Sequence, residues 1–337
     1  MTQRVCLESA SLPRRAKHGW GMRAGRQTTL RSSVTLSGIG VHSGVPAALT
    51  LQPADPDTGI VFVRIGGDGR ANQELRADVR SVYATDFATV LGDRAGPLCA
   101  TAEHILAALC GLGVDNATIE IDGPEVPILD GSAEPFVEAI DRAGVVNTAR
   151  PRRYLKVLKP VRVANGRSVG ELRPYEFGFR VETEIDFDHP LIGRQTFAID
   201  LDATTFRQGV ARARTFGFMS DVAKLWSAGY ALGANFDNTL VLAEDRVLNP
   251  DGLRFPDEFV RHKALDAIGD LALAGAPLLA AYHSVCGGHK LNHAVLSALM
   301  ADRSAWTMVE ASDSRRVRGR ADLATGYPAP AFGPATS

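Results

Sequence analysis

The chain has 337 residues, of which 45% are hydrophobic, and its formal net charge is -1 at pH 7. A length of this order favours two domains, and the apolar content is sufficient for two buried cores. The near-zero net charge excludes a global basic field, so we expect no nucleic acid partner and no recruitment to an anionic membrane surface.

Membrane and cysteine signals are weak throughout the chain. No apolar run approaches the roughly 18–20 residues of a membrane span, and the first 26 residues lack the apolar core of a signal peptide. We therefore expect no membrane span and a cytoplasmic protein. The cysteines form no C-x-x-C pair, which argues against a zinc ribbon or a dithiol motif and favours reduced thiols. They are Cys6, Cys99, Cys110 and Cys286.

The two ends of the chain have compositions typical of disorder. Residues 1–26 are basic with little apolar periodicity, and residues 317–337 are rich in Ala, Pro and Gly. Neither segment can bury a core, so we predict a disordered basic extension and a disordered tail. A Pro/Arg-rich junction at 148–153 divides the remainder into an N-terminal domain, 27–149, and a C-terminal domain, 153–316.

In the N-terminal part, the segments 61–65 (VFVRI) and 116–122 (NATIEID) have strand character. Between them, 101–113 (TAEHILAALCGLG) has apolar residues at helical spacing and a glycine-rich end. This order predicts strands layered with a helix.

The C-terminal part begins with the clearest strand of the sequence, 177–187, where apolar and polar residues alternate. The buried face would carry Phe177, Phe179, Val181, Thr183, Ile185 and Phe187. Residues 210–232 predict a short helix, 238–249 a further strand, and 259–272 a longer helix. The short helix carries an apolar stripe, which usually packs into a core. The stripe consists of Met219, Val222, Leu225 and Trp226.

The two longer predicted helices resemble each other, since both are apolar with a histidine near the start, one in each half of the chain. Two similar halves, each a sheet layered with helices, would bring these helices together at the domain interface. Chance similarity also explains a match this short. We nevertheless predict an α+β fold of two related domains whose helices face each other across an interdomain active site.

The helix 259–272 has an unusual polar stripe. His262 and Asp266 are four residues apart and share a face, and Asp270 lies one turn farther on. A weak surface pair between imidazole and carboxylate explains such spacing equally well. The apolar face of this helix would carry Leu265, Ile268 and Leu271.

The other predicted helix favours a functional site over a surface pair. Glu103 directly precedes His104 at the start of a helix that must be largely buried, where an imidazole needs a partner. Together with His262 and Asp266, His104 completes two imidazoles and one carboxylate, the ligand set of catalytic zinc with one open position. Glu103, beside a ligand, is then the candidate general base.

An acid for the leaving group is suggested by the segment 286–293 (CGGHKLNH). Gly287 and Gly288 allow close backbone approach to a pocket and present His289 there. A surface turn is the alternative interpretation, and His293 is a competing acid.

Six segments of the chain together resemble the UDP-3-O-acyl-N-acetylglucosamine deacetylases, which perform the committed step of lipid A biosynthesis (lipopolysaccharide synthesis) in Gram-negative bacteria. The resemblance covers about residues 27–305. In chain order the segments are GIGVHSG, TAEHILAALCGLGVDN, EVPILDGSA, ARARTFGF, DGLRFPDEFVRHKALDAIGDL and GGHKLN.

This resemblance implies a hydrolase, a monomer of two related α+β domains, which uses Zn²⁺ to remove the N-acetyl group of UDP-3-O-(3-hydroxyacyl)-N-acetylglucosamine. It implies that Asp270 orients His289, that Lys263 contacts the anionic or sugar portion of the substrate, and that Thr215 donates to the oxyanion. Phe216 and the stripe would form a passage for the acyl chain. The role of His42 in GVHSG stays open.

Two other kinds of zinc protein fit this ligand set less well. A zinc peptidase would be expected to carry H-E-x-x-H, which is absent from the sequence. A structural zinc site would favour four protein ligands over three with an adjacent free glutamate. The sequence does not decide between zinc and ferrous iron in the cell, between one and two acid/base residues, or which acyl chain length is preferred.

Overall fold

The computed structural model describes residues 25–66 and 72–311. The predicted N-terminal extension and C-terminal tail lie outside the described residues, except that Gly25 and Arg26 are described and Arg26 begins strand β1 (Arg26–Leu30). Across the described residues, no helix is both long enough and apolar enough to span a membrane.

The first half of the chain is built on a five-stranded sheet of order β2-β3-β9-β4-β5. Its central strand β9 is parallel to β4 and antiparallel to β3. Helix α1 (Glu103–Leu112) precedes β9 and α2 (Glu134–Ala143) follows it. The strands are β2 (Val34–Ile39), β3 (Pro46–Pro53), β4 (Ile60–Arg64), β5 (Gln73–Arg76) and β9 (Ala117–Ile121). The two predicted strands and the predicted helix of this half are confirmed as β4, β9 and α1.

The second half repeats this order as β12-β13-β18-β14-β15. Its central strand β18 is parallel to β14 and antiparallel to β13, and it follows α5 (Glu258–Ala272) and precedes α6 (His289–Ala301). The strands are β12 (Val161–Asn165), β13 (Ser168–Pro174), β14 (Phe179–Phe187), β15 (Gly193–Asp200) and β18 (Leu278–Val285). The predicted α+β fold of two related halves is confirmed.

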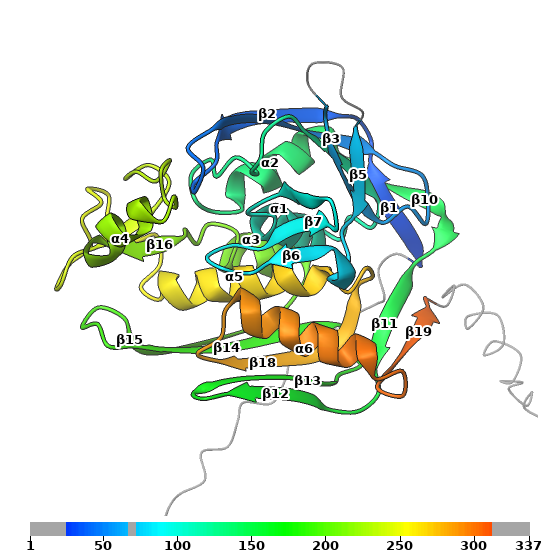
Figure 1. Cartoon of the computed structure of the whole chain (residues 1–337). Helices are drawn as coiled ribbons and strands as arrows, with labels where there is room; N and C mark the ends of the chain where they lie inside the picture. Colours follow the sequence, from blue (N-terminus) through cyan, green and yellow to red (C-terminus); the bar gives the residue numbers. More distant parts are fainter. Residues whose placement is uncertain (1–24, 67–71, 312–337) are drawn as a thin grey trace, which may run out of the picture.

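The helices of both halves lie between the two sheets, as Figure 1 shows. Helix α1 packs against α5, and the contact is close, because a Cβ on Gly269 of α5 would lie 2.0 Å from the Glu103 carbonyl oxygen. Only glycine allows the two backbones to approach in this way. The apolar face of α5 is fully buried at Leu265, Ile268 and Leu271, as predicted, and one continuous core joins both halves.

Each half carries an insertion before the helix that precedes its central strand. In the first half it comprises the 3-10 turn η1 (Val79–Ser81), β6 (Val82–Ala84), β7 (Val90–Asp93) and β8 (Gly96–Cys99). In the second half it comprises α3 (Ala203–Gly209), β16 (Phe216–Phe218), the 3-10 turn η2 (Met219–Asp221), α4 (Val222–Ser227) and β17 (Leu240–Leu242). Both insertions reach the interface between the halves.

The Pro/Arg-rich junction consists largely of strands. Strand β10 (Val145–Pro151) pairs with β1, and β11 (Arg153–Val157) pairs with β18 and with β19 (Trp306–Glu310). Only Arg152 separates β10 from β11, so the two halves are joined without a loose linker.

Two sequence predictions for strands extend too far. Phe177 lies outside β14 and is 61% exposed, because Gly178 has φ +122° and the pairing of β14 with β18 begins only at Phe179. The predicted strand 238–249 is reduced to β17, since Ala243 turns back to bond with Arg246.

Candidate active site

Three buried side chains meet where α1 packs against α5. His104 lies in the first turn of α1, and His262 and Asp266 lie one turn apart on α5. Each offers one ligand atom, and these atoms all lie within 4.8 Å of one another. The Asp266 Oδ1 atom is 3.3 Å from His262 Nε2 and 3.7 Å from His104 Nε2. The structure therefore brings the three predicted ligands together.

The charges of these three groups suit a cation. Burial lowers the pKa of His104 to about 3 and also lowers the pKa of His262, so both imidazoles are neutral and retain a lone pair. Burial alone would raise the pKa of Asp266, but His262 and Lys263 beside it hold that pKa below its usual range. The set is two neutral nitrogens and one carboxylate.

Two atoms of this set, His104 Nδ1 and Asp266 Oδ1, lack a hydrogen-bond partner among the described residues. Both atoms are buried. A buried anionic oxygen without a donor or cation is costly. A divalent cation held among the three ligand atoms would remove that cost, and the donor set fits zinc with one position left open.

A hydrogen bond on the side away from the ligand set orients the ring of His262. Its Nδ1 lies 3.0 Å from the carbonyl oxygen of Ala213, which can only accept, so Nδ1 carries the proton and Nε2 keeps its lone pair. A hydrogen bond of this kind on the far nitrogen is the usual way to orient a metal-ligating histidine.

Glu103 lies beside the ligand set and is almost fully buried. Its Oε2 accepts a hydrogen bond from the backbone N–H of Thr89 at 3.0 Å, and its Oε1 faces His289 Nε2 at 3.7 Å. Burial raises the pKa of Glu103 to about 7. A carboxylate with such a pKa can both take and return a proton near neutral pH.

His289 is the first residue of α6, so the alternative of a surface turn is wrong. Its Nδ1 donates to Asp270 Oδ2 at 2.9 Å, on the side away from Glu103. Burial alone would lower the pKa of His289, but the carboxylates of Asp270 and Glu103 raise it to about 10. His289 is therefore an imidazolium at neutral pH.

Two residues of this network were missed from the sequence. Thr89 Oγ1 donates to Asp270 Oδ1 at 2.6 Å, and Asn292 Nδ2 donates to Asp270 Oδ2 at 2.8 Å. Thr89 thus holds both Glu103, through its N–H, and Asp270, through its hydroxyl. Asn292 stands in the GGHKLN segment three residues after His289, which was the available signal.

Two predicted substrate-binding residues, Lys263 and Phe216, lie beside the ligand set. Lys263 Nζ donates to Asp266 Oδ2 at 2.8 Å and lies 5.7 Å from the ring centroid of Phe216. The Phe216 ring is 6.3 Å from the ring of His262. Thr215 precedes it, and its N–H donates to the Gly131 carbonyl of the first half at 2.8 Å. These residues are therefore close to the ligand set.

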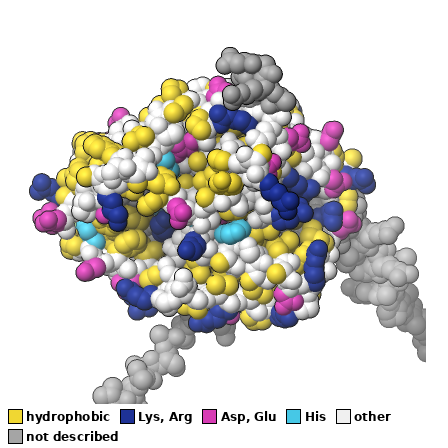
Figure 2. All heavy atoms as spheres, viewed as in Figure 1, with side chains coloured by type: hydrophobic (Ala, Val, Ile, Leu, Met, Phe, Trp, Pro, Cys, Tyr) yellow, Lys and Arg dark blue, Asp and Glu magenta, His cyan; other side chains and the backbone are white. Residues whose placement is uncertain are grey.

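The apolar stripe of η2 and α4 is not a core element. Met219 is 46% exposed and Trp226 is 58% exposed, and Val222 and Leu225 are only partly buried. Figure 2 shows hydrophobic side chains gathered on the left of the molecule, where Figure 1 places α4 and β16. The core interpretation of this stripe is wrong.

His42 lies next to aromatic side chains of both insertions. Its ring is 5.5 Å from the ring of Tyr230 and 6.4 Å from that of Phe87, and burial lowers the pKa of His42. Its backbone N–H donates to the buried carboxylate of Glu125 at 3.0 Å. These contacts place His42 between the two insertions.

Comparison with known proteins identifies the family. Residues 27–301 match the family model of the UDP-3-O-acyl N-acetylglycosamine deacetylases. The chain belongs to this family. UDP-3-O-acyl-N-acetylglucosamine deacetylases of Brucella ovis, Brucella canis and Brucella melitensis biotype 2 are each 53% identical to it over 286 residues, which cover 85% of this chain and 99% of each relative.

The deacetylase match spans both halves and contains all the site residues described above.

Proposed function

We propose that this protein is a zinc-dependent amidohydrolase that removes the N-acetyl group of UDP-3-O-(3-hydroxyacyl)-N-acetylglucosamine, giving the free amine and acetate. The observation that carries this proposal is the convergence of three buried ligand atoms, one of them an orphaned carboxylate oxygen, beside a carboxylate and an imidazolium. Membership of the deacetylase family supports the same reaction, which belongs to lipid A biosynthesis.

His104, His262 and Asp266 would hold the ion. Bound there, zinc would supply Lewis acidity, which acidifies water and polarises the amide carbonyl. The remaining steps belong to side chains of this chain, whose burial keeps bulk water away from the reacting groups.

Glu103 takes a proton from the attacking water as the C–O bond forms. Its pKa near 7 leaves a large fraction ionised at neutral pH, and its fixed Oε2 keeps Oε1 turned toward His289. The positive charge of His289, steadied by Asp270, offsets the negative charge that develops on the acetyl oxygen. Thr215 contributes a hydrogen bond to the same oxygen.

Collapse of the tetrahedral state breaks the C–N bond, and the amine leaves with a proton. His289 and the newly protonated Glu103 face each other at 3.7 Å, so either is placed to return that proton. The order of these transfers is a kinetic question, which the pH dependence addresses.

The remaining groups bind the rest of the substrate. Lys263 meets the sugar or anionic portion, and the exposed apolar stripe of η2 and α4, with Phe216 at its start, receives the acyl chain. Burial of the chain against this surface would contribute roughly 25 cal/mol per Å² of apolar area. We further propose a monomer acting in the cytoplasm, where the nucleotide sugar is available.

Acetate release from the UDP-sugar substrate tests the proposal. The zinc-loaded protein should release one acetate per free amine formed, lose this activity after dialysis against a chelator, and regain it with zinc. Reconstitution with ferrous iron compares the two candidate metals. Absence of acetate release from protein that contains one zinc per chain would refute the proposed function.

A further inference from the structure

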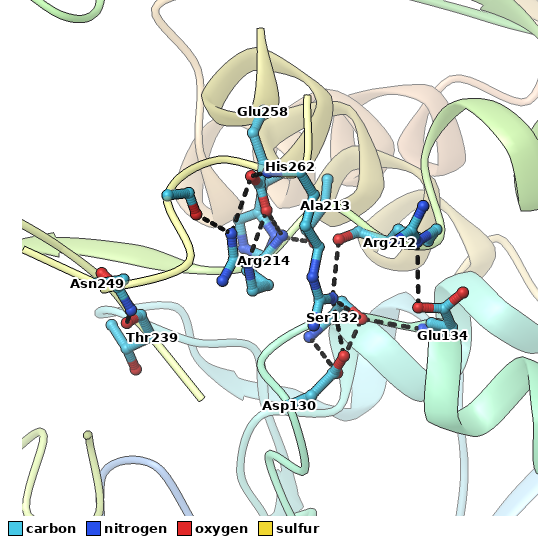
Figure 3. Close-up of polar contacts among 12 residues, drawn as sticks. Asp130, Ser132, Glu134, Arg212, Ala213, Arg214, Thr239, Asn249, Glu258 and His262 are labelled. Carbon is cyan, nitrogen blue, oxygen red and sulfur yellow. Dashed lines mark hydrogen bonds and ion pairs between the residues drawn. The ribbon is translucent and has the colours of Figure 1, made fainter. Parts of the chain in front are cut away.

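A buried ion pair stands directly behind the ligand set. Arg214 is 5% exposed and Glu258 is fully buried, and they are joined by two bonds, from Nε to Oε1 at 2.9 Å and from Nη2 to Oε2 at 3.2 Å. Figure 3 shows this pair next to His262. Neither residue belongs to the ligand set or to the proton-transfer groups described above.

The Glu258 carboxylate also binds the backbone of two segments. It accepts from the N–H of Arg214 itself at 3.0 Å and from the N–H of Arg254 at 2.6 Å. Arg214 Nη2 donates in addition to the Gly252 carbonyl at 2.7 Å. The pair therefore clamps residues 214, 252 and 254 to the first turn of α5.

The Arg214–Glu258 pair is connected to the proposed metal ligand His262. Ala213, whose carbonyl accepts from His262 Nδ1, immediately precedes Arg214, and Glu258 lies one helical turn before His262. Glu258 of α5 binds Arg214, and the carbonyl of the preceding residue, Ala213, binds His262 of the same helix. The orientation of the imidazole is thus set by a closed ring of short bonds. Thr215, on the other side of Arg214, is set by the same clamp.

Stability alone gives little reason for such a pair. Two charges lose their hydration on burial, and apolar residues of similar volume often serve stability equally well or better. Because this pair is buried beside a proposed metal ligand in spite of that cost, we infer that its role is to hold the neighbouring groups in position.

From these contacts we propose that Arg214 and Glu258 are positioning residues for metal binding: they fix the Ala213 carbonyl and, through it, the tautomer and ring orientation of His262. This inference rests on the proposed metal site. It predicts that the pair can be replaced without loss of the fold but not without loss of metal affinity.

The test is the double variant Arg214→Leu with Glu258→Leu, in which no unpaired charge is left behind. The zinc dissociation constant, measured by competition with a chelating dye, should rise about 10- to 100-fold, the usual range for groups that orient a ligand. The metal-free protein should still fold, with a lower thermal midpoint, because the backbone N–H groups of Arg214 and Arg254 lose their acceptor. The visible absorption of the cobalt-substituted protein, which reports ligand geometry, should change.

A matched control removes the partly buried pair Arg152–Asp115, whose Nε to Oδ1 distance is 2.9 Å and which lies beyond the end of α1. Replacing both residues by leucine should leave zinc affinity and the cobalt spectrum unchanged. Zinc affinity within twofold of the wild type in a folded Arg214/Glu258 double variant would overturn the inference.

If that double variant does not fold, Glu258→Gln decides the matter, because it keeps the size of the side chain and one acceptor oxygen while it removes the charge and the second acceptor oxygen. A severalfold weaker zinc affinity supports the inference, and unchanged affinity refutes it. Failure of the metal site itself is a separate result, since His262→Ala would then retain a full equivalent of zinc.

Discussion

The two halves of the molecule share a sheet order and a pair of helices, yet they use the same positions differently. In the second half, the helix that follows the central strand begins with His289, which faces Glu103. In the first half, the equivalent helix α2 follows Asp130 and Ser132, both of which accept hydrogen bonds from Arg254 of the other half. One position carries the proposed catalytic histidine, and its counterpart joins the halves. A repeated fold therefore does not imply a repeated site.

The helices before the central strands divide the proposed metal ligands unequally, with one on α1 and two on α5. Removal of either contribution should abolish zinc binding, so His104→Ala and His262→Ala should both contain almost no zinc by elemental analysis. We expect turnover to fall by about 1,000-fold or more, because a Lewis acid contributes several kcal/mol. His293→Ala, one turn beyond His289, is the control. A full equivalent of zinc in either variant would rule out the shared site.

The first residues of α1 and α2 offer a sharper contrast. Glu103→Gln should keep its zinc and lower kcat about 100- to 10,000-fold, the usual contribution of a general base. Glu134→Gln, at the first position of α2, should behave as the wild type. Near-normal turnover of Glu103→Gln would mean that another group takes the proton.

The pH dependence should be bell-shaped. Activity should rise with pH as Glu103, whose pKa is about 7, becomes ionised, and fall toward pH 10 as His289 loses its proton. A bound divalent cation adds positive charge, which moves the acidic limb of the loaded enzyme below 7. Asp270→Asn removes the carboxylate that raises the pKa of His289, so its basic limb should move to lower pH. A basic limb that does not move would separate Asp270 from this role.

The hydroxyl of Thr89 links the first insertion to α5. Thr89→Val keeps the backbone bond to Glu103 but removes the donor to Asp270, and a hydrogen bond to a charged group is worth about 1.5–3 kcal/mol. We expect kcat to fall roughly 10-fold or somewhat more, with recovery in Thr89→Ser. Equal activity of the valine and serine variants would show that the hydroxyl is dispensable.

The smallest effect concerns the second insertion. Trp226→Ala should leave stability unchanged, because the side chain is largely exposed, and should raise KM severalfold for a long-chain substrate. A short-chain substrate should show no change. Equal effects on both substrates would remove α4 from the acyl passage.

The sequence predicted the ligand set because its clues are local. His262 and Asp266 are one turn apart, and Glu103 and His104 are adjacent, so helical periodicity alone shows what each helix presents. The halves were recognisable from the same apolar pattern. Alternation failed at Phe177, because nothing local marks where strand pairing begins.

The supporting network was beyond such reasoning. Thr89 and Asp270 meet only because the first insertion lies against α5 of the other half. The partner of His262 Nδ1 is a backbone carbonyl, which no residue type in the sequence indicates. Arg214 and Glu258 each look like ordinary charged residues until the fold buries them against each other.

The shared ligand set also bears on how the molecule holds together. A cation held by His104 of α1 and by His262 and Asp266 of α5 would link the two halves across the α1–α5 interface. Metal binding stabilises the state in which the two halves are packed together. The metal-free protein should therefore open at the α1–α5 interface before either sheet unfolds. Hydrogen exchange measures this directly: the amides of α1 and α5 should exchange faster without zinc than with it.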